Sequence, residues 1–205
     1  MKKIIIAMPV YNDWDSLIKL LQEIDLIIAD FKDYSFECLI INDSSTAQKP
    51  KFKIPSSFNL ITIIEMKINQ GHARCIATGL KYIYEKKDFD YIIPMDGDGE
   101  DRPEEIKDFM NQIKTSNGKP IVGLRVKRSE SLLFQICYKL HKLITVTFTG
   151  KTIKFGNFTC LPKTTVEKMI KEKATWSSFS GALTKIENEL IPIPSIRGNR
   201  YFGPS

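Results

Sequence analysis

The sequence has little histidine, which limits the kinds of metal site it can form. Only two histidines are present, His72 and His141, so a site built from several imidazole ligands is excluded. Any bound metal must be held mainly by carboxylates. Carboxylate oxygens favour hard ions such as Mg²⁺ or Mn²⁺.

Paired cysteines and long apolar runs are also missing. The four cysteines form no C-x-x-C pair, which favours buried reduced thiols in a reducing cytoplasm, although spacing alone leaves a disulfide open. No stretch reaches the roughly 18 apolar residues of a membrane span. The run Ile4–Met8 is too short for the core of a signal peptide and lacks a cleavage-like site at its end. We therefore predict a first strand there, and no membrane crossing.

The composition is that of one folded domain with a basic balance. The chain has 205 residues, 42% hydrophobic and 26% charged, with a formal net charge of +6. Such a charge suits nucleotide phosphates, a phospholipid surface or nucleic acid, or simply reflects a basic surface. Scattered lysines and the lack of an aromatic-basic motif argue against nucleic acid. The sequence carries no signal for an oligomeric state.

Short apolar runs alternate with amphipathic stretches, which predicts an α/β fold with an open, mostly parallel sheet and helices on both faces. The second half is less regular, with a strand region over 150–161, a helix over 164–171 and an extended, loop-like tail over 190–205. In the first half we predict strands at 4–8, 36–41, 60–66, 91–95 and 120–124, a loop at 46–59, and helices at 14–29, 71–85 and 103–113.

Three of the predicted strands end in polar, turn-forming segments. These segments are Pro9–Asp13, Asn42–Ser45 and Asp96–Glu100. Ligands of open α/β sheets bind beyond the carboxyl ends of the strands, so the three segments are expected to lie side by side in a binding site.

The segment Asp96-Gly97-Asp98-Gly99-Glu100 places alternate carboxylates on one side of an extended chain. Clustered carboxylates repel one another unless a cation sits among them. A divalent ion bridging a diphosphate would satisfy both groups, so Asp96, Asp98 and Glu100 are predicted metal ligands. The alternative is a solvated acidic loop that caps the helix beginning at Pro103.

In their order along the chain, these motifs resemble those of family 2 glycosyltransferases. The match is nearest to the dolichol-phosphate mannosyltransferase-like branch, which includes bacterial polyprenyl-phosphate glycosyltransferases. That branch typically has D-x-D-x-Q-D-P-P-E, from which this chain departs at Glu100 and Arg102. The matching segments are Pro9–Asn12, Asn42–Ser45, Asn69-x-Gly71-x-Ala73 with Gly79, Asp96–Glu104, Arg125 with Arg128, the imperfect Gly156-Asn157-Phe158, and Arg200 with Gly203 and Ser205.

The resemblance implies a single GT-A (Rossmann-like) catalytic domain over 1–205. Residues 1–126 would form the donor part, and 127–205 the acceptor side, apposed to a membrane. The resemblance also implies that Asp98 and Glu100 bind the metal, which Asp96 would share. It implies that Asp96 and Asp98 serve catalysis and that the arginines meet phosphates. It further implies that Asn157 cannot be a charged base, and we expect a structural role for His72. The implied donor contacts are Pro9, Tyr11, Asn12, Asp13, Asp43, Asn69, Gly71 and Asp96, and the implied phosphate contacts are Arg125, Arg128 and Arg200.

In the family that this chain resembles, many inverting members that glycosylate hydroxyls use an acidic pair late in the domain as general base. The corresponding region here, 174–182, contains no carboxylate. A phosphate acceptor is already ionised and needs no base, so the absence favours a lipid phosphate. Glu187 or Glu189 supplying the base is the alternative. The apolar and basic stretch Leu132–Ile144 fits an interfacial helix or, equally, an ordinary core helix.

These observations predict an inverting, Mg²⁺- or Mn²⁺-dependent transfer of a sugar from a UDP- or GDP-sugar to a polyprenyl phosphate. The enzyme would act in the cytoplasm at the inner face of the membrane. Two alternatives remain: transfer to a hydroxyl of a growing glycan, and a nucleotide-sugar-binding protein without transfer activity.

Overall fold

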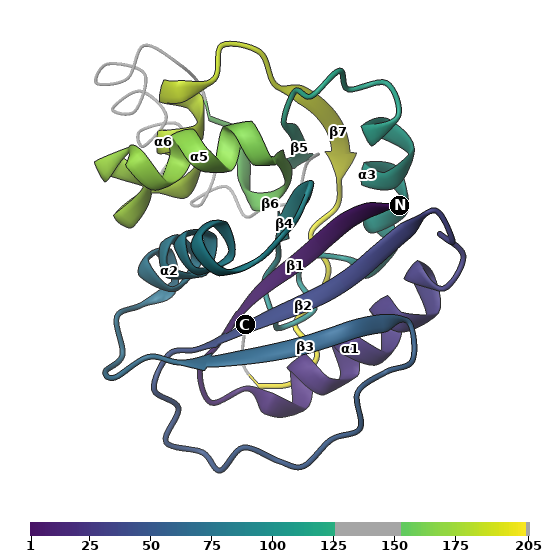
Figure 1. The fold of residues 1–205 in the computed structure, drawn as a ribbon. Coiled ribbons are helices and arrows are strands. Elements are labelled where there is room, and N and C mark those ends of the chain that lie inside the picture. Colours follow the sequence, from purple (N-terminus) through teal and green to yellow (C-terminus); the bar gives the residue numbers. More distant parts are fainter. Residues whose placement is uncertain (126–152, 204–205) are drawn as a thin grey trace, which may run out of the picture.

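The computed structural model describes residues 1–125 and 153–203. They form a seven-stranded sheet in the order β3-β2-β1-β4-β6-β5-β7, with helices on both faces (Figure 1). The elements are β1 (Lys2–Val10), α1 (Trp14–Ile28), β2 (Tyr34–Asn42), β3 (Phe58–Glu65), α2 (His72–Lys86), β4 (Tyr91–Pro94), the 3₁₀ turn Pro103–Glu105, α3 (Ile106–Ile113), β5 (Ile121–Arg125), β6 (Phe155–Pro162), α5 (Lys163–Lys171), the 3₁₀ turn Lys173–Trp176, α6 (Phe179–Ile186) and β7 (Ile191–Ser195).

The sheet is mostly parallel, as predicted. Strands β3, β2, β1 and β4 are parallel to one another, and β5 is parallel to β7. Strand β6 is antiparallel to both of its neighbours, β4 and β5. From β1 the chain builds outward through β2 and β3, then returns to add β4 on the other side of β1. The order of strands therefore reverses between β1 and β4, which is where open α/β sheets bind their ligands.

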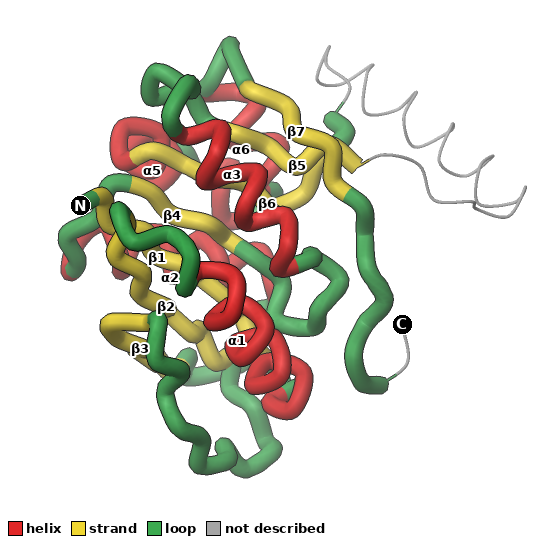
Figure 2. The backbone as a smooth tube through the Cα atoms, turned by 90° about the vertical axis from the view of Figure 1, so that its right-hand side faces the viewer, coloured by secondary structure: helices red, strands yellow, loops and turns green. Residues whose placement is uncertain are grey.

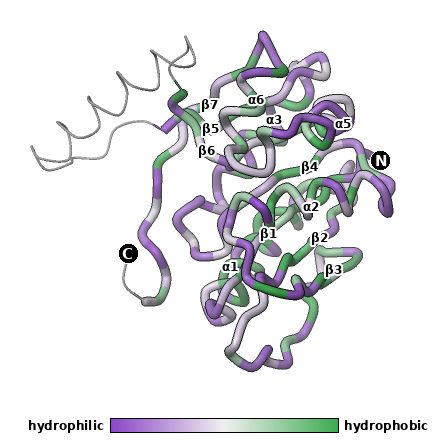
Figure 3. The backbone as a smooth tube through the Cα atoms, turned by 90° about the vertical axis from the view of Figure 1, so that its left-hand side faces the viewer, coloured by the Kyte–Doolittle hydropathy of each residue, from purple (hydrophilic) through white to green (hydrophobic). Residues whose placement is uncertain are grey.

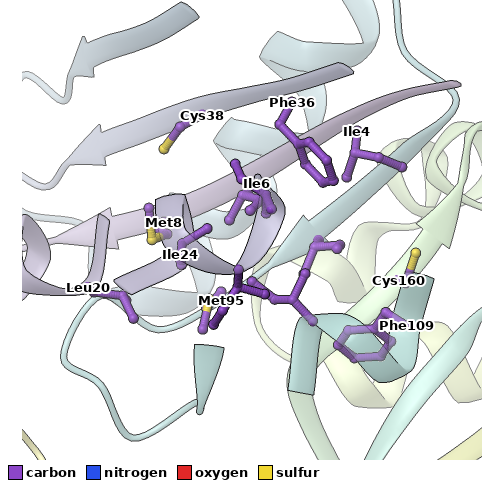
Figure 4. Packing of buried hydrophobic residues seen from close by; sticks show 14 of the residues in the cluster. Ile4, Ile6, Met8, Leu20, Ile24, Phe36, Cys38, Met95, Phe109 and Cys160 are labelled. Carbon is purple, nitrogen blue, oxygen red and sulfur yellow. The ribbon is translucent and has the colours of Figure 1, made fainter. Parts of the chain in front are cut away.

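Alternating side chains of β1 divide the core between the two faces of the sheet. Ile4, Ile6 and Met8 pack with buried residues of α1 and α3, and Figure 4 shows this cluster. Ile5 and Ala7 face the opposite way, toward α2, α5 and α6. Figure 3 shows the apolar residues gathered along the strands. Each fully buried isoleucine or leucine contributes about 1.5–3 kcal/mol, so the central strands are firmly held and fix the loops at their ends.

The tail of the chain differs from the prediction. Residues 190–205 were expected to be loop-like, but Ile191–Ser195 forms β7 and pairs in parallel with β5. Pro192 and Pro194 suggested a loop because proline cannot donate to a sheet ladder. At the edge of a sheet, however, every second backbone N–H points to solvent, so prolines are tolerated there. The segment after β7 returns toward α1 (Figure 2).

Several predictions fall outside the described residues. These predictions concern residues in or beside 126–152 or 204–205. They are Arg128, the stretch Leu132–Ile144, the boundary between residues 126 and 127, and Ser205. In the part of the chain that is described, no helix combines the length and apolar character needed to cross a bilayer.

Candidate functional site at the carboxyl edge of the sheet

The loops after β1 and β2 are joined by hydrogen bonds around Asn12. Its backbone N–H donates to Ser45 Oγ at 2.9 Å, and its side-chain oxygen accepts from the Ala47 N–H at 2.9 Å. Asn12 has a φ of 53° and Ser44 a φ of 60°, so both adopt the left-handed conformation that asparagine tolerates better than most residues. The two predicted strand-end segments therefore lie side by side.

The acidic loop, Asp96–Asp101, passes directly against the end of β1. A Cβ added at Gly97 would lie 2.9 Å from the carbonyl oxygen of Pro9. Only glycine permits this approach without displacing the backbone. The acidic loop and the β1 loop consequently flank the point where the strand order reverses.

Asp43 shapes the loop that leads into α2. Its side chain is buried, and its two carboxylate oxygens accept the backbone N–H groups of Gln70 and Gly71 at 2.7 and 2.8 Å. Gly71 has a φ of 83°, a conformation that L residues rarely adopt. Asp43 thus holds the start of α2 in place, and its predicted contact with a nucleotide base remains a prediction.

Asp96 lies at the centre of the site and connects three elements. Its Oδ1 accepts a hydrogen bond of 2.8 Å from Asn157 Nδ2 on β6 and lies 3.3 Å from His72 Nε2 at the start of α2. Its backbone N–H donates to Asp101 Oδ2 at 2.9 Å. Asn157, the imperfect member of its motif, therefore donates to the predicted catalytic carboxylate. An aspartate could not make this contact in its ionised form.

The carboxylates of the acidic loop affect one another. Burial, followed by the charge of Asp96, raises the pKa of Asp98, and Arg200 and Arg197 oppose this shift. Burial and the charge of Asp96 also raise the pKa of Asp101. Such shifts arise where like charges are brought together in a poorly solvated place, which is common at functional sites.

The site offers a divalent cation some of its ligands but not a full shell. Within residues 1–125 and 153–203, no three His, Cys, Asp or Glu side chains converge as a metal site. Glu100, the third predicted ligand, is instead paired with Arg197 and has a side chain only 9% exposed. Mg²⁺ is commonly bound by one or two carboxylates, several waters and substrate phosphates. Asp96 and Asp98 fit an ion shared in this way with a diphosphate.

The C-terminal segment, residues 196–203, lies along the acidic loop. The backbone N–H groups of Gly198 and Tyr201 donate to the carbonyl oxygens of Glu100 and Asp98 at 2.8 and 2.9 Å. Arg200 Nη2 lies 2.6 Å from Asp13 Oδ2. The Tyr201 hydroxyl donates to Glu23 on α1. The predicted phosphate contact Arg200 is therefore brought to the site, next to Asp13.

A substitution at Gly99 can test the packing of the C-terminal segment against the acidic loop. It has a φ of 88°, and an added Cβ would lie 2.5 Å from the Tyr201 ring. We expect Gly99→Ala to destabilise the protein by about 2–3 kcal/mol, because alanine is strained at positive φ and the ring, held by Glu23, must move. Chemical denaturation measures the loss. Gly118→Ala is the matched control, since Gly118 also has positive φ (74°) but has nothing within 4 Å of an added Cβ. Equal losses in the two variants would contradict a role for Tyr201.

A pocket of about 590 Å³ opens beside Asp13 and Arg200. We call it the β1 pocket, and its walls include Tyr11, Asn12, Asp13, Trp14, Arg200 and Phe202. Tyr11 is 49% exposed at its mouth. The β1 pocket combines aromatic surface with a carboxylate and a guanidinium. Such a lining suits a ring that bears polar and anionic groups.

Most predicted site residues meet at this edge of the sheet. The guanidinium of Arg125 packs over Gly156, since a Cβ there would lie 2.8 Å from its Nη2; this places Arg125 next to Asn157. Asn69 lies exposed on the loop before α2. Sequence analysis missed Arg197 and Tyr201. Their one signal is their position within three residues of Arg200, in a tail interpreted as a loop.

Residues 5–176 match the family model for glycosyl transferase family 2. The chain belongs to this family. Among curated proteins it is 25% identical over 212 residues to an undecaprenyl-phosphate 4-deoxy-4-formamido-L-arabinose transferase of Klebsiella pneumoniae. It is 27% identical over 216 residues to the transferase of the same name from Salmonella choleraesuis. Each match covers all of this chain but 62% of the relative.

Solved structures support the fold. S. aureus TarS 1-349 in complex with UDP-GlcNAc superposes with a TM-score of 0.64 at 16% identity, over 99% of this chain and 60% of that one. The glucosyl-3-phosphoglycerate synthase of Mycobacterium tuberculosis, in complex with Mn²⁺, UDP-glucose and phosphoglyceric acid, gives 0.62 at 10% identity, over 99% and 73%. The predicted GT-A fold and the predicted family are therefore confirmed.

Proposed function

We propose that this domain transfers a sugar from a nucleotide diphosphate sugar to a polyprenyl phosphate, with inversion at the anomeric carbon. The observation that carries the proposal is the acidic loop at the reversal point between β1 and β4, where Asp98 interacts electrostatically with Asp13 and Arg200 of the β1 pocket. Two curated relatives are named for transfer to undecaprenyl phosphate. In this proposal residues 1–126 bind the donor, and 127–205 contribute the acceptor side.

The donor's nucleoside would occupy the β1 pocket, near Tyr11 and Asn12, with its base toward Asp43. Its diphosphate would extend to the acidic loop. Asp98, together with Asp96, would hold a Mg²⁺ or Mn²⁺ ion, which neutralises the charge that develops on the leaving diphosphate. The TarS structure contains UDP-GlcNAc, and the synthase structure contains Mn²⁺ with UDP-glucose. These complexes support a similar ligand set here.

In this proposal Arg200 and Arg125 would contact phosphate oxygens. Arg200 now pairs with Asp13, and a planar guanidinium binds a phosphate through two parallel hydrogen bonds. In the transfer step, an oxygen of the acceptor phosphate forms a bond to the anomeric carbon. The bond from that carbon to the donor diphosphate breaks, and its electron pair leaves with the nucleoside diphosphate.

The positions of Glu187 and Glu189 favour a phosphate acceptor over a hydroxyl. Glu187 Oε1 accepts from Thr165 Oγ1 at 2.8 Å and pairs with Lys168 on α5. Glu189 pairs with Lys119, just before β5 begins. Both carboxylates therefore lie toward the opposite edge of the sheet from the acidic loop. The two glutamates that sequence analysis offered as a base are thus poorly placed, and an ionised phosphate needs none.

The proposal is tested by incubating the protein with UDP- and GDP-sugars and farnesyl phosphate, with Mn²⁺, Mg²⁺ or EDTA. We expect release of nucleoside diphosphate, together with a glycosyl farnesyl phosphate, only when a divalent ion is present. Transfer to free oligosaccharides instead would assign the acceptor to the glycan class. Donor binding without any product would mean that the protein binds nucleotide sugars but does not transfer the sugar. Contact of residues 132–144 with the inner face of the membrane remains part of the proposal.

A further inference from the structure

The pairing of β4 with β6 brings Asn157 to Asp96. The two strands are antiparallel, and their register pairs Ile92 with Leu161. Continued toward the start of β6, the same register places Asn157 opposite Asp96, just beyond the end of β4 at Pro94. Residues that lie opposite each other in an antiparallel pair have their side chains on one face and in contact distance. The contact between Asn157 and Asp96 is therefore built into the sheet.

The core holds Asn157 in this orientation through its neighbour in β6. Phe158 is 4% exposed and packs in the cluster with α1 and α3, where its ring centroid lies 4.9 Å from that of Phe109. Successive side chains of a strand point to opposite faces. Asn157 consequently points to the face that α2 covers, and His72 at the start of α2 reaches the same carboxylate.

These two residues occupy only one oxygen of Asp96. An ionised carboxylate only accepts hydrogen bonds, so the contact at Oδ1, 2.8 Å from Asn157 Nδ2, requires a donor at position 157. His72 Nε2 lies 3.3 Å from the same oxygen. Within residues 1–125 and 153–203, no group donates to the second oxygen, Oδ2. Asp96 thus has one oxygen fixed by the protein and one available to a ligand.

We propose that Asn157 is a positioning residue: its amide, with His72, holds Oδ1 of Asp96 so that Oδ2 is presented to the donor and its ion. This inference rests on the function proposed above. It also accounts for the asparagine in the G-D-F segment, because an aspartate there would add a further like charge beside Asp96 and Asp98. If the amide oxygen of Asn157 instead bound the ion directly, a carboxylate at this position should bind it more tightly.

Two variants of nearly the same size test this role. Asn157→Leu removes the donor without adding charge, and Asn157→Asp replaces it with an acceptor. Both should lower kcat about tenfold or more, because a small displacement of a catalytic carboxylate costs much of its effect. The KM for farnesyl phosphate should stay within about twofold. The aspartate variant carries the test if the leucine variant does not fold.

Asn59→Leu is the matched control, because Asn59 is a strand residue of β3 whose side chain accepts a hydrogen bond of 3.1 Å from Ser35 Oγ, away from the site. It should retain the wild-type kcat. An Asn157→Asp variant with wild-type or higher kcat would overturn the proposal, because the donated hydrogen bond would then be dispensable.

Coupling to Asp96 separates a positioning role from a general structural one. If Asn157 acts through Asp96, its replacement should matter little once that carboxylate is gone. We therefore expect Asp96→Ala and the double variant Asp96→Ala, Asn157→Leu to have kcat values within about twofold of each other. A loss of structure, or a direct contact of Asn157 with substrate, would instead multiply the two losses, and that result would overturn the proposal.

Thermal shift distinguishes this inference from the proposed function, because it requires no transfer. With UDP or GDP present, the Mn²⁺ concentration that gives half of the shift should rise about threefold or more in Asn157→Leu and stay unchanged in Asn59→Leu. This result without any transfer by the wild type would refute the proposed function and support the positioning of Asp96. Wild-type transfer, with kcat and Mn²⁺ response both unchanged in Asn157→Leu, would refute the positioning role alone.

Discussion

Replacing Asp98 by asparagine should lower sugar transfer by about 100-fold or more, because the variant loses a charge that the diphosphate-bound ion requires. Asparagine has nearly the same shape, and its side-chain oxygen can still accept the Glu100 N–H, which lies 3.0 Å from Asp98 Oδ1. The change therefore removes charge and preserves the local hydrogen bond. Initial rates of nucleoside diphosphate release at saturating donor measure the effect.

The Asp98→Asn substitution should lower the rate of transfer without lowering the stability of the fold. Burial and the Asp96 charge raise the pKa of Asp98 in the folded protein. An acid whose folded pKa lies above its unfolded value destabilises the fold once the pH exceeds both, so the cost is present at neutral pH. Removing the charge should leave Tm equal or higher. The conflict between stability and activity is typical of a functional residue.

Thermal shift completes this test. In the wild type, UDP or GDP together with Mn²⁺ should raise Tm more than either alone, because a shared ion links the two. Asp98→Asn should lose that synergy and keep the shift caused by nucleotide alone. Asp108→Asn, an exposed residue of α3, is the control and should retain both. A variant at Asp98 that keeps transfer and synergy would show that the acidic loop is not the donor site.

The central part of the fold follows from local patterns. Runs such as Ile4–Met8 and Tyr91–Met95 are short, apolar and bounded by breakers, so their strands were predicted close to where they lie. The polar strand ends could be predicted to converge because parallel strands place their carboxyl ends at one edge. Asp13, Asp96, Asp98 and Arg200 accordingly lie at one site.

The elements that were missed depend on distant partners. β7 contains two prolines and is a strand only because β5 offers it an edge. The turn at Lys173–Trp176 and α6 are short, and their buried residues, such as Phe179 and Leu183, pack against helices far away in the sequence. The pairing of Glu100 with Arg197 has no local signal at all. Local periodicity cannot report such contacts.

The Glu100–Arg197 pair leads to the second large prediction. The resemblance implied that Glu100 binds the metal, whereas the structure shows its buried carboxylate paired with Arg197. Arg197→Met should destabilise the protein by about 2–3 kcal/mol, because it leaves a buried carboxylate without its partner. Glu100→Gln should cost less, because it removes the charge that needs pairing. Chemical denaturation at pH 7 measures both changes.

The double variant Glu100→Gln, Arg197→Met should be more stable than Arg197→Met alone. Removing both charges eliminates the unpaired carboxylate, and a coupling of about 1–3 kcal/mol is expected for residues in direct contact. Additive losses would mean that the ion pair contributes nothing, and that the backbone contacts from Gly198 and Tyr201, with the side-chain contacts of Arg200 and Tyr201, hold the C-terminal segment.

Metal affinity then distinguishes the two roles of Glu100. If the carboxylate is committed to Arg197, the Mn²⁺ concentration that gives half of the nucleotide-dependent thermal shift should change by less than about threefold in Glu100→Gln. A loss of tenfold or more would show that the charge of Glu100 holds the ion, as the resemblance implied. In that case Arg197 must release Glu100 when the donor binds, and the C-terminal segment would move with it. With Glu100 committed to Arg197, the segment would remain in place, and Asp98 would be the principal carboxylate ligand of the proposed ion.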